Sequence, residues 1–418
     1  MAYAEKVYKV RNGKQTKQFT WRSRYKKPDG TWGSEPGFPT KVLAENWGEE
    51  QEAAIRSGRW IDPDLMRKPF GKWAREWMAA KSPRGRTTTT RWEKLEAHIL
   101  PRWEHTPLVA IDWFSAESWA NSLTCHDSTA TQCLSIMSSI LTGAVDAKHI
   151  LVNPLAGRRR SRTAEAKAAM QKKDQEDLWA PPEVVLQLAR RVGPRDGLHI
   201  LTTAFAGVRW GEGLALRATA LGERRERFDG AEFVCQTLSV LEEVAEYRPR
   251  LPDGTKLKLR LQLEPVKTVE SKRTIDLPPF LAQLLAAHAA THPHEFLFCT
   301  AAGGWWRGSN FRRQVIRPAA DGRTALAVTK GHPERAEWAP IMKGVTMRDL
   351  RHTHDTYQDQ IGVRPALAFE QAGHKRPGIK AVYQHPTPAM RRARLEGLQE
   401  IYEGGMKALG WSRIWEES

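Results

Sequence analysis

The chain has 418 residues, 40% of them hydrophobic, which is enough for two or three domains with ordinary cores. Lysine and arginine total 65 against 48 aspartate and glutamate residues, and the net charge of +17 favours a polyanionic partner, with nucleic acid as the first candidate. An anionic membrane is the rival partner, but no apolar run approaches the roughly 18 residues of a membrane span. The N-terminus lacks the apolar core of a secretory signal, so we expect a soluble, cytoplasmic protein.

Residues 1–62 are predicted to form a small β-rich module. Segments 7–10 and 19–25 are rich in β-branched and aromatic residues, which is typical of strands, and a helix is expected from residue 40 to about residue 57. Basic side chains lie on or beside these strands: Lys14, Lys17, Arg22, Arg24, Lys26 and Lys27. They favour contact with DNA, although a solvated hairpin surface would also carry such a set.

Residues 63–165 are predicted to form an all-α domain, because apolar residues recur in helical register along them. Segment 84–90 is a basic, hydroxyl-rich start to one of these helices. Free N–H groups at a helix start suit phosphate contacts, so Arg84, Arg86 and Thr87 are candidate DNA contacts.

A charged segment follows this helical domain. Arg159 and Arg160 open it and are further candidates for DNA contact, and residues 166–180 are interpreted as a linker. Its composition suits a linker that crosses a DNA backbone, and it suits an ordinary solvated linker nearly as well.

The largest domain is predicted at residues 181–400, with a tail at 401–418. It is expected to be mainly helical (α+β), with a small sheet or hairpin. Residues 256–263 alternate between polar residues and leucine, which is the clearest strand signal in the chain. The chain is therefore predicted to be a multidomain protein that contains a β-rich module, an all-α domain and this mainly α domain.

Cationic side chains and one hydroxyl group lie close together in the sequence near the end of this domain. Arg348, Arg351 and His352 share one segment, and His374 is followed nine residues later by Tyr383. Positions i and i+3 share a helical face, so Arg348 and Arg351 could face one phosphate, although a solvated helix face can also carry two arginines. A hydroxyl group that could attack the phosphate follows.

This segment resembles the second half of the active site of the tyrosine recombinase (phage integrase) family. Arg351 takes the place of the second arginine in the family's His-x-x-Arg box, and His374 matches its Gly-His histidine. Arg348 departs from the pattern, because it stands where the box has histidine. An arginine stays protonated, so it can donate hydrogen bonds but cannot take the tyrosine proton. His352 is a supporting candidate.

Two earlier motifs extend the resemblance. Arg209, in the stretch AGVRWGEGLALR, resembles the first-arginine box, and Glu212 fits the glutamate that orients this arginine. Lys267, ten residues before the end of a PVKT–SKRTIDL stretch, resembles the β-hairpin lysine that acts as general acid toward the 5′ oxygen, with Lys272 as its rival. The elements that match in order are Arg209, Lys267, Arg351, His374 and Tyr383.

The resemblance implies DNA cleavage without a metal ion or other cofactor. Cationic groups neutralise the phosphate, and arginine suits this because its planar fork makes two charge-assisted hydrogen bonds. Tyr383 would attack the phosphate and leave a 3′-phosphotyrosyl enzyme, which keeps the bond energy available for rejoining. The four cysteines lack the spacing of a metal site, and we expect reduced thiols.

The family's activity is site-specific DNA recombination, and the three-module layout points to an integrase of a phage or integrative element. It implies an arm-type DNA-binding module at residues 1–62, a core-binding domain at 63–165 and a catalytic domain at 181–400. The implied partners are double-stranded DNA attachment sites and further copies of the chain in a homotetramer, with room for accessory DNA-bending or directionality factors. The tail after Tyr383 could dock on a neighbouring protomer or pack on its own core.

Two alternatives stay open. A non-catalytic, sequence-specific DNA-binding protein would have Arg348 as the mark of a decayed recombinase site. A type IB topoisomerase-like enzyme would use similar chemistry for relaxation alone, and the three-module layout argues against it.

Overall fold

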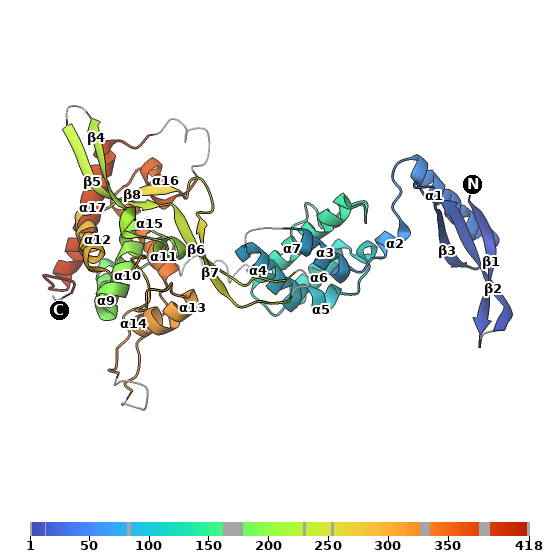
Figure 1. The fold of residues 1–418 in the computed structure, drawn as a ribbon, viewed down its shortest axis with the longest axis horizontal. Helices are drawn as coiled ribbons and strands as arrows, with labels where there is room; N and C mark the ends of the chain where they lie inside the picture. The colour runs from blue at the N-terminus through green and yellow to red at the C-terminus, as the bar shows by residue number, and fades with distance from the viewer. Residues whose placement is uncertain are drawn as a thin grey trace. The chain divides into compact units, whose positions relative to one another are not determined.

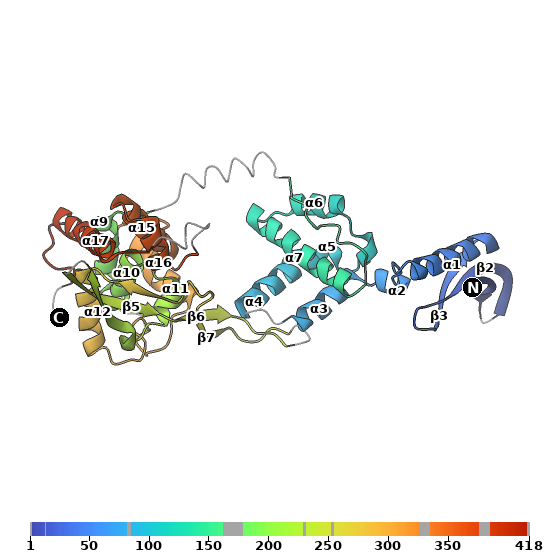
Figure 2. The same ribbon diagram turned by 90° about the horizontal axis from the view of Figure 1, so that it is seen from above.

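The computed structural model describes residues 2–12, 14–81, 85–161, 179–228, 231–251, 255–326, 335–375 and 385–415. The chain divides into two compact units, one made of Met1–Lys167 with Arg250–Thr255 and the other of Ala168–Pro249 with Lys256–Ser418. Helices and small sheets together (Figure 1, Figure 2) confirm the prediction of a mixed α and β protein. Among the described residues, no helix combines the length and apolar character that a membrane crossing requires.

The first unit begins with a three-stranded antiparallel sheet and one helix. The elements are β1 (Tyr3–Arg11), β2 (Lys14–Lys26), β3 (Trp32–Phe38) and α1 (Lys41–Arg56). The Thr40 hydroxyl accepts a hydrogen bond from the Leu43 N–H and so caps the start of α1. Tyr25 is buried and packs edge-on against Trp47 and Trp60, which provides a small aromatic core for this part of the chain.

The described chain between residues 63 and 161 is helical. Its helices are α2 (Pro63–Met66), α3 (Phe70–Ala80), α4 (Gly85–Lys94), η1 (Leu95–Ile99), α5 (Leu100–Trp103), η2 (Leu108–Ala110), α6 (Trp113–Ser122) and α7 (Asp127–Asp146). One face of α7 is apolar and packs into a core with Phe70 and Trp103, which accounts for the helical register of its apolar residues.

The second unit surrounds the buried helix α10. Its helices are α9 (Pro182–Val192), α10 (Pro194–Ala206), α11 (Trp210–Leu214), η3 (Ala218–Ala220), α12 (Pro279–Thr291), α13 (Gly308–Phe311), η4 (Arg312–Ile316), α14 (Arg317–Asp321), α15 (Met347–Gln360), α16 (Pro365–Ala372) and α17 (Pro388–Ala408). Leu398 and Met406 of α17 are buried in the core of the same unit. Residues 388–408, which follow Tyr383 in the sequence, therefore pack on their own unit.

The strands of the second unit form one sheet and one hairpin. They are β4 (Leu221–Phe228), β5 (Ala231–Val240), β6 (Glu242–Tyr247), β7 (Arg260–Pro265) and β8 (Arg273–Asp276), in the antiparallel order β4-β5-β8 and the separate pair β6-β7. The helices α12 and α17 contact the β4-β5-β8 sheet (Figure 1).

The strand predicted at residues 256–263 is observed as β7 (Arg260–Pro265), which starts and ends later than predicted. It begins at Arg260, because the partner strand β6 reaches only to Tyr247, opposite Arg260. Charged strands β4 and β6 were not predicted. β4 is an edge strand with the sequence LGERRERF, so it lacks the apolar alternation that reveals a half-buried strand.

Candidate active site

The turn between α10 and α11 holds Arg209 in place. Gly207 ends α10 with φ of +65°, a conformation that favours glycine, and a Cβ atom there would lie 2.4 Å from the His354 ring. Arg209 is the N-cap of α11. Its backbone N–H donates to Glu212 Oε2 at 2.8 Å and its Nη1 donates to Glu212 Oε1 at 2.6 Å. The glutamate thus fixes both the backbone and the guanidinium group of Arg209.

The helix α15 carries Arg351. A capping box starts this helix, in which the Thr346 hydroxyl accepts from the Asp349 N–H while the Asp349 carboxylate accepts from the Thr346 N–H. One turn along, Arg351 donates from Nη2 to the Ala372 carbonyl at 2.8 Å and from Nη1 to the Gly207 carbonyl. Arg351 therefore lies between the end of α10 and the end of α16.

Three successive carbonyl groups at the end of α16 each accept a hydrogen bond from a different arginine. Those of Gln371, Ala372 and Gly373 accept, in that order, from Arg273 Nε at 2.8 Å, Arg351 Nη2 at 2.8 Å and Arg209 Nη2 at 3.4 Å. The last carbonyls of a helix have no partner within the helix and form the negative end of its dipole, so they attract cations. Gly373, with φ of +65°, then turns the chain toward His374.

His374 lies at the same point. Its Nε2 is 3.3 Å from Arg351 Nη2, and because a guanidinium group only donates, Nε2 accepts and the proton of the neutral ring is on Nδ1. Burial lowers the pKa of His374, and the charges of Arg351 and Arg209 lower it further. The ring is therefore neutral at pH 7 and has one N–H free to donate to a ligand.

The positive charge of this cluster is only partly neutralised. Burial raises the pKa of Glu212, but its hydrogen bonds with Arg273 and the charges of Arg273 and Arg209 together lower it to about 2. This one carboxylate serves two arginines. Among the described residues Arg351 binds carbonyl oxygens and an imidazole and forms no ion pair with a carboxylate. Burial and the nearby charge of Arg209 lower the pKa of Arg351 to about 10, so it stays charged at pH 7 and suits an anion.

Comparison with known proteins gives a consistent result. No family model matches the chain. The integrase of Mycobacterium phage L5 is 22% identical over 384 residues, which cover 87% of this chain and 90% of that protein. The integrase of Mycobacterium phage FRAT1 is 22% identical over 360 residues, which cover 83% and 94%. The Tn1549 transposon integrase, solved in complex with circular intermediate DNA, has the same fold with a TM-score of 0.51 at 16% identity, over 79% of this chain and 99% of that one.

The chain is thus similar to phage integrases over most of its length and shares the fold of the Tn1549 transposon integrase.

The other residues of the predicted motifs lie outside the arginine cluster or outside the described residues. Lys267 is exposed in the turn between β7 and β8. Arg348 is exposed on α15 and donates from Nε to His352 Nε2 at 3.3 Å, so the arginine at the usual histidine position binds a histidine one turn later. The predicted nucleophile, Tyr383, falls within residues 376–384, outside the described residues.

The residues predicted to contact DNA in the N-terminal sheet differ in their remaining charge. Arg22 and Arg24 both bind Glu5 Oε1, at 3.2 Å and 3.0 Å, which partly neutralises them. Lys26 is exposed, with its ammonium group 5.9 Å from the Trp32 ring centre. Lys26 is therefore the freest cation of the three.

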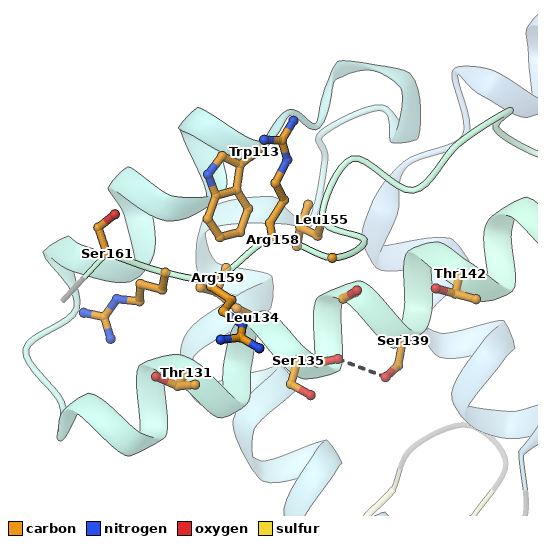
Figure 3. Close-up of a pocket in the computed structure, with 13 residues that line it drawn as sticks. Trp113, Thr131, Leu134, Ser135, Ser139, Thr142, Leu155, Arg158, Arg159 and Ser161 are labelled. Carbon is orange, nitrogen blue, oxygen red and sulfur yellow. Dashed lines mark hydrogen bonds between the residues drawn. The ribbon is translucent and has the colours of Figure 1, made fainter.

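The candidate DNA contacts in the helical part of the first unit also differ in their exposure and pairing. Arg86 and Thr87 are exposed in the first turn of α4, and Arg84 lies outside the described residues. Arg159 is exposed and lines a cavity of about 840 Å³ beside the hydroxyl-bearing face of α7 (Figure 3). Arg160 lines it too, but its side chain is only 9% exposed.

Arg160 donates at 2.6 Å to Asp127 and at 2.7 Å to Asn121. These bonds engage Nε and Nη1 inside the domain, so Arg160 has a structural role, and its contact with DNA stays a prediction.

Sequence reasoning missed Arg273, which is 7% exposed and binds both oxygens of Glu212. It stands in the cationic run SKRT next to exposed Lys272, which precedes strand β8 while Arg273 opens it. Alternate residues of a strand face opposite sides, but this alternation alone does not say which of the two cations points inward.

Proposed function

We propose that this chain is a site-specific DNA recombinase, an integrase of a phage or other integrative element, which cuts and rejoins DNA through a 3′-phosphotyrosine intermediate. The observation that carries the proposal is the meeting of Arg209, Arg351 and His374 at the end of α16, where the cations outnumber the carboxylates that bind them. A DNA phosphate supplies the missing negative charge.

Each group then has a separate task in cleavage. Arg209 and Arg351 hold the non-bridging oxygens of the scissile phosphate and stabilise the charge that grows there, and His374 donates a third hydrogen bond. The Tyr383 oxygen forms a bond to phosphorus while the bond from phosphorus to the 5′ oxygen breaks. Lys267 gives its proton to that departing oxygen, and the tyrosine proton passes to solvent or a nearby base.

Arg348 adds a donor and removes the usual base. It remains protonated, so it can bind the phosphate but cannot receive the tyrosine proton. Its hydrogen bond to His352 places an imidazole one turn farther along α15. His352 supports the site by orienting the Arg348 guanidinium group.

The rest of the chain provides DNA binding. We assign arm-type DNA contact to the basic sheet of residues 1–62, where Arg22, Arg24 and Lys26 lie on one strand, and core-site contact to the helical residues 63–165 through Arg86, Thr87 and Arg159. The recombining species is a homotetramer on two duplexes, as the resemblance to the tyrosine recombinase family implies. Attachment-site DNA and further copies of the chain are its partners.

A second function, sequence-specific DNA binding without catalysis, is favoured by one observation. Arg348 stands at the position where the family has histidine, and the structure pairs it with His352 and not with the arginine cluster. A protein of this kind would bind its site and form no covalent bond to it.

Covalent trapping separates the two functions. Wild type, Tyr383→Phe and the control Tyr247→Phe, which changes a half-buried tyrosine of the same unit, are incubated with a suicide DNA substrate nicked beside the cleavage point of a candidate attachment site. We expect wild type and Tyr247→Phe to give a protein–DNA band that survives denaturant, and Tyr383→Phe to give none. Binding without a band for wild type would support the non-catalytic function. A band with Tyr383→Phe would be consistent with the same class of enzyme but would show that the nucleophile is a residue other than Tyr383.

A further inference from the structure

We propose that Arg273 is a positioning residue for strand cleavage: it ties together the three elements that carry Arg209, His374 and Lys267. This inference rests on the proposed recombinase function, because it concerns the geometry of the same site. Arg273 itself is 7% exposed, so it acts on the phosphate through the groups it holds and does not touch DNA.

Four hydrogen bonds fix the Arg273 guanidinium group in one orientation. It donates from Nη1 to Glu212 Oε1 at 3.1 Å, from Nη2 to Glu212 Oε2 at 2.9 Å, from Nη1 to the Ser271 carbonyl at 3.1 Å and from Nε to the Gln371 carbonyl at 2.8 Å. A planar fork can bind three directions at once, whereas the point charge of lysine cannot. Each of these directions leads to a different part of the site.

The first direction leads to Arg209. Glu212 receives both terminal nitrogens of Arg273 on one side and the backbone and side chain of Arg209 on the other. A carboxylate held by two arginines has little freedom to rotate. The angle at which Arg209 meets the phosphate is therefore set by the position of Arg273 on β8.

The second direction leads to the end of α16. The Gln371 carbonyl that Arg273 binds is next to the carbonyl that accepts from Arg351. A Cβ atom on Gly373 would lie 3.0 Å from Arg273 Cδ and 3.0 Å from Arg273 Nη1, so the backbone just before His374 rests directly on the arginine. Arg273 thereby fixes the position of the backbone turn that carries His374.

The third direction leads to the turn that carries Lys267. Ser271 is buried, and its carbonyl accepts from Arg273 while its N–H donates to the Thr268 hydroxyl at 3.2 Å. The base of the turn is thus fixed to the arginine cluster, and Lys267 beside it stays exposed. The general acid and the phosphate-binding arginines share one buried anchor.

The test separates positioning from binding and from folding. Full-length wild type, Arg273→Lys and Arg273→Gln are compared in single-turnover cleavage of the suicide substrate, and their affinity for an uncleaved duplex is measured in the Tyr383→Phe background. Arg224→Lys is the matched control, because Arg224 lies on β4 of the same sheet and its side chain binds Asp276 and Glu226 in place of Glu212 and the Gln371 carbonyl. Thermal melting shows which variants are folded at the assay temperature.

We expect Arg273→Lys to form the covalent adduct about 10²-fold more slowly than wild type, since small misplacements of reacting groups cost rates of that order. Its DNA affinity should stay within about threefold of the wild-type value, and Arg224→Lys should cleave at close to the wild-type rate. If Arg273→Lys is unfolded at the assay temperature, Arg273→Gln, which leaves Glu212 paired with Arg209, takes its place.

Other outcomes overturn the inference. A folded Arg273 variant that cleaves at the wild-type rate shows that the anchor is not needed, and a variant whose slow rate is matched by an equal loss of affinity shows a binding role. If both variants unfold, Arg273 is a folding residue only. If wild type itself forms no adduct, the proposed function fails and this inference fails with it, a result that differs from failure of the Arg273 variants alone.

Discussion

Two arginine clusters in the second unit are neutralised in different ways. At the end of α16, the described partners of three arginines include one carboxylate, that of Glu212. In the first turn of α17, Arg391 donates from Nη1 to Asp276 at 2.7 Å and to Glu370 at 2.8 Å. Both clusters hold buried guanidinium groups, but only the second has carboxylates to match its charge.

The pKa shifts follow this difference. Burial opposes the charge of Arg391, yet the bonds and charges of Glu370 and Asp276 raise its pKa above the ordinary value. Burial and the charge of Arg209 lower the pKa of Arg351 to about 10. An ion pair complete within the fold holds the fold together, whereas an incompletely paired cation at the surface of the unit is available to a ligand. The pKa shift alone does not separate the two kinds of arginine, because burial also lowers the pKa of Arg394 on α17 to about 10; the available carboxylates and the access of a ligand do.

The largest expected effect comes from removing the charge of Asp276, which is 1% exposed. Its carboxylate accepts from Arg224 and Arg391, so Asp276→Asn leaves buried arginines without their shared counter-charge. We expect the free energy of unfolding in urea to fall by about 3–5 kcal/mol. The control Glu223→Gln removes a carboxylate from the exposed pair with Arg225 and should change it by less than about 1 kcal/mol. Equal effects of the two changes would contradict the contrast between buried and exposed pairs.

A second prediction concerns His354, which lies between the two clusters. Its Nδ1 is 3.2 Å from the Ala204 carbonyl and its Nε2 is 3.4 Å from Arg394. Burial, and then the charges of Arg394 and Arg351, lower its pKa well below the ordinary value. The unfolded chain therefore binds a proton below about pH 6.5 that the folded chain does not, and stability falls as pH falls, by about 1.4 kcal/mol per pH unit.

Urea unfolding at pH 7.0, 6.0 and 5.0 measures this slope. His354→Gln keeps a hydrogen-bonding side chain and removes the proton, so its loss of stability between pH 6.0 and 5.0 should be smaller than that of wild type by about 1 kcal/mol. Parallel curves for the two proteins would mean that His354 is not a neutral group at the junction of the clusters.

The smallest effect extends the comparison to the first unit. Exposed Arg159 and internally paired Arg160 are neighbours in sequence, so they form a matched pair. Arg159→Ala should lower the slope of log binding constant against log salt by about 1, the value for one lost phosphate contact. Arg160→Ala should leave that slope unchanged and lower the melting temperature. The reverse assignment of these two effects would show that pairing does not predict which arginine binds DNA.

Local spacing predicted more of the site than long-range packing did. Arg209 with Glu212, three residues apart, and the two residues Gly373 and His374 follow from short motifs, because their geometry is set within one turn. Arg273 could not be assigned, since its burial depends on the Gln371 carbonyl 98 residues away and on Glu212 61 residues away. Strand β4 escaped prediction because its charged residues pair along a sheet edge that only the folded chain creates.

The most direct test compares Arg351→Gln with Arg391→Gln in two assays, covalent adduct formation and urea unfolding. For Arg351→Gln we predict a cleavage rate lower by about 10²–10³-fold with an unfolding free energy equal to or above that of wild type, because a charge used only in the transition state is removed. For Arg391→Gln we predict a loss of about 3–5 kcal/mol of stability and near-normal cleavage by the protein that remains folded. If Arg351→Gln cleaves at the wild-type rate, or unfolds as Arg391→Gln does, the cluster at the end of α16 is not the phosphate site.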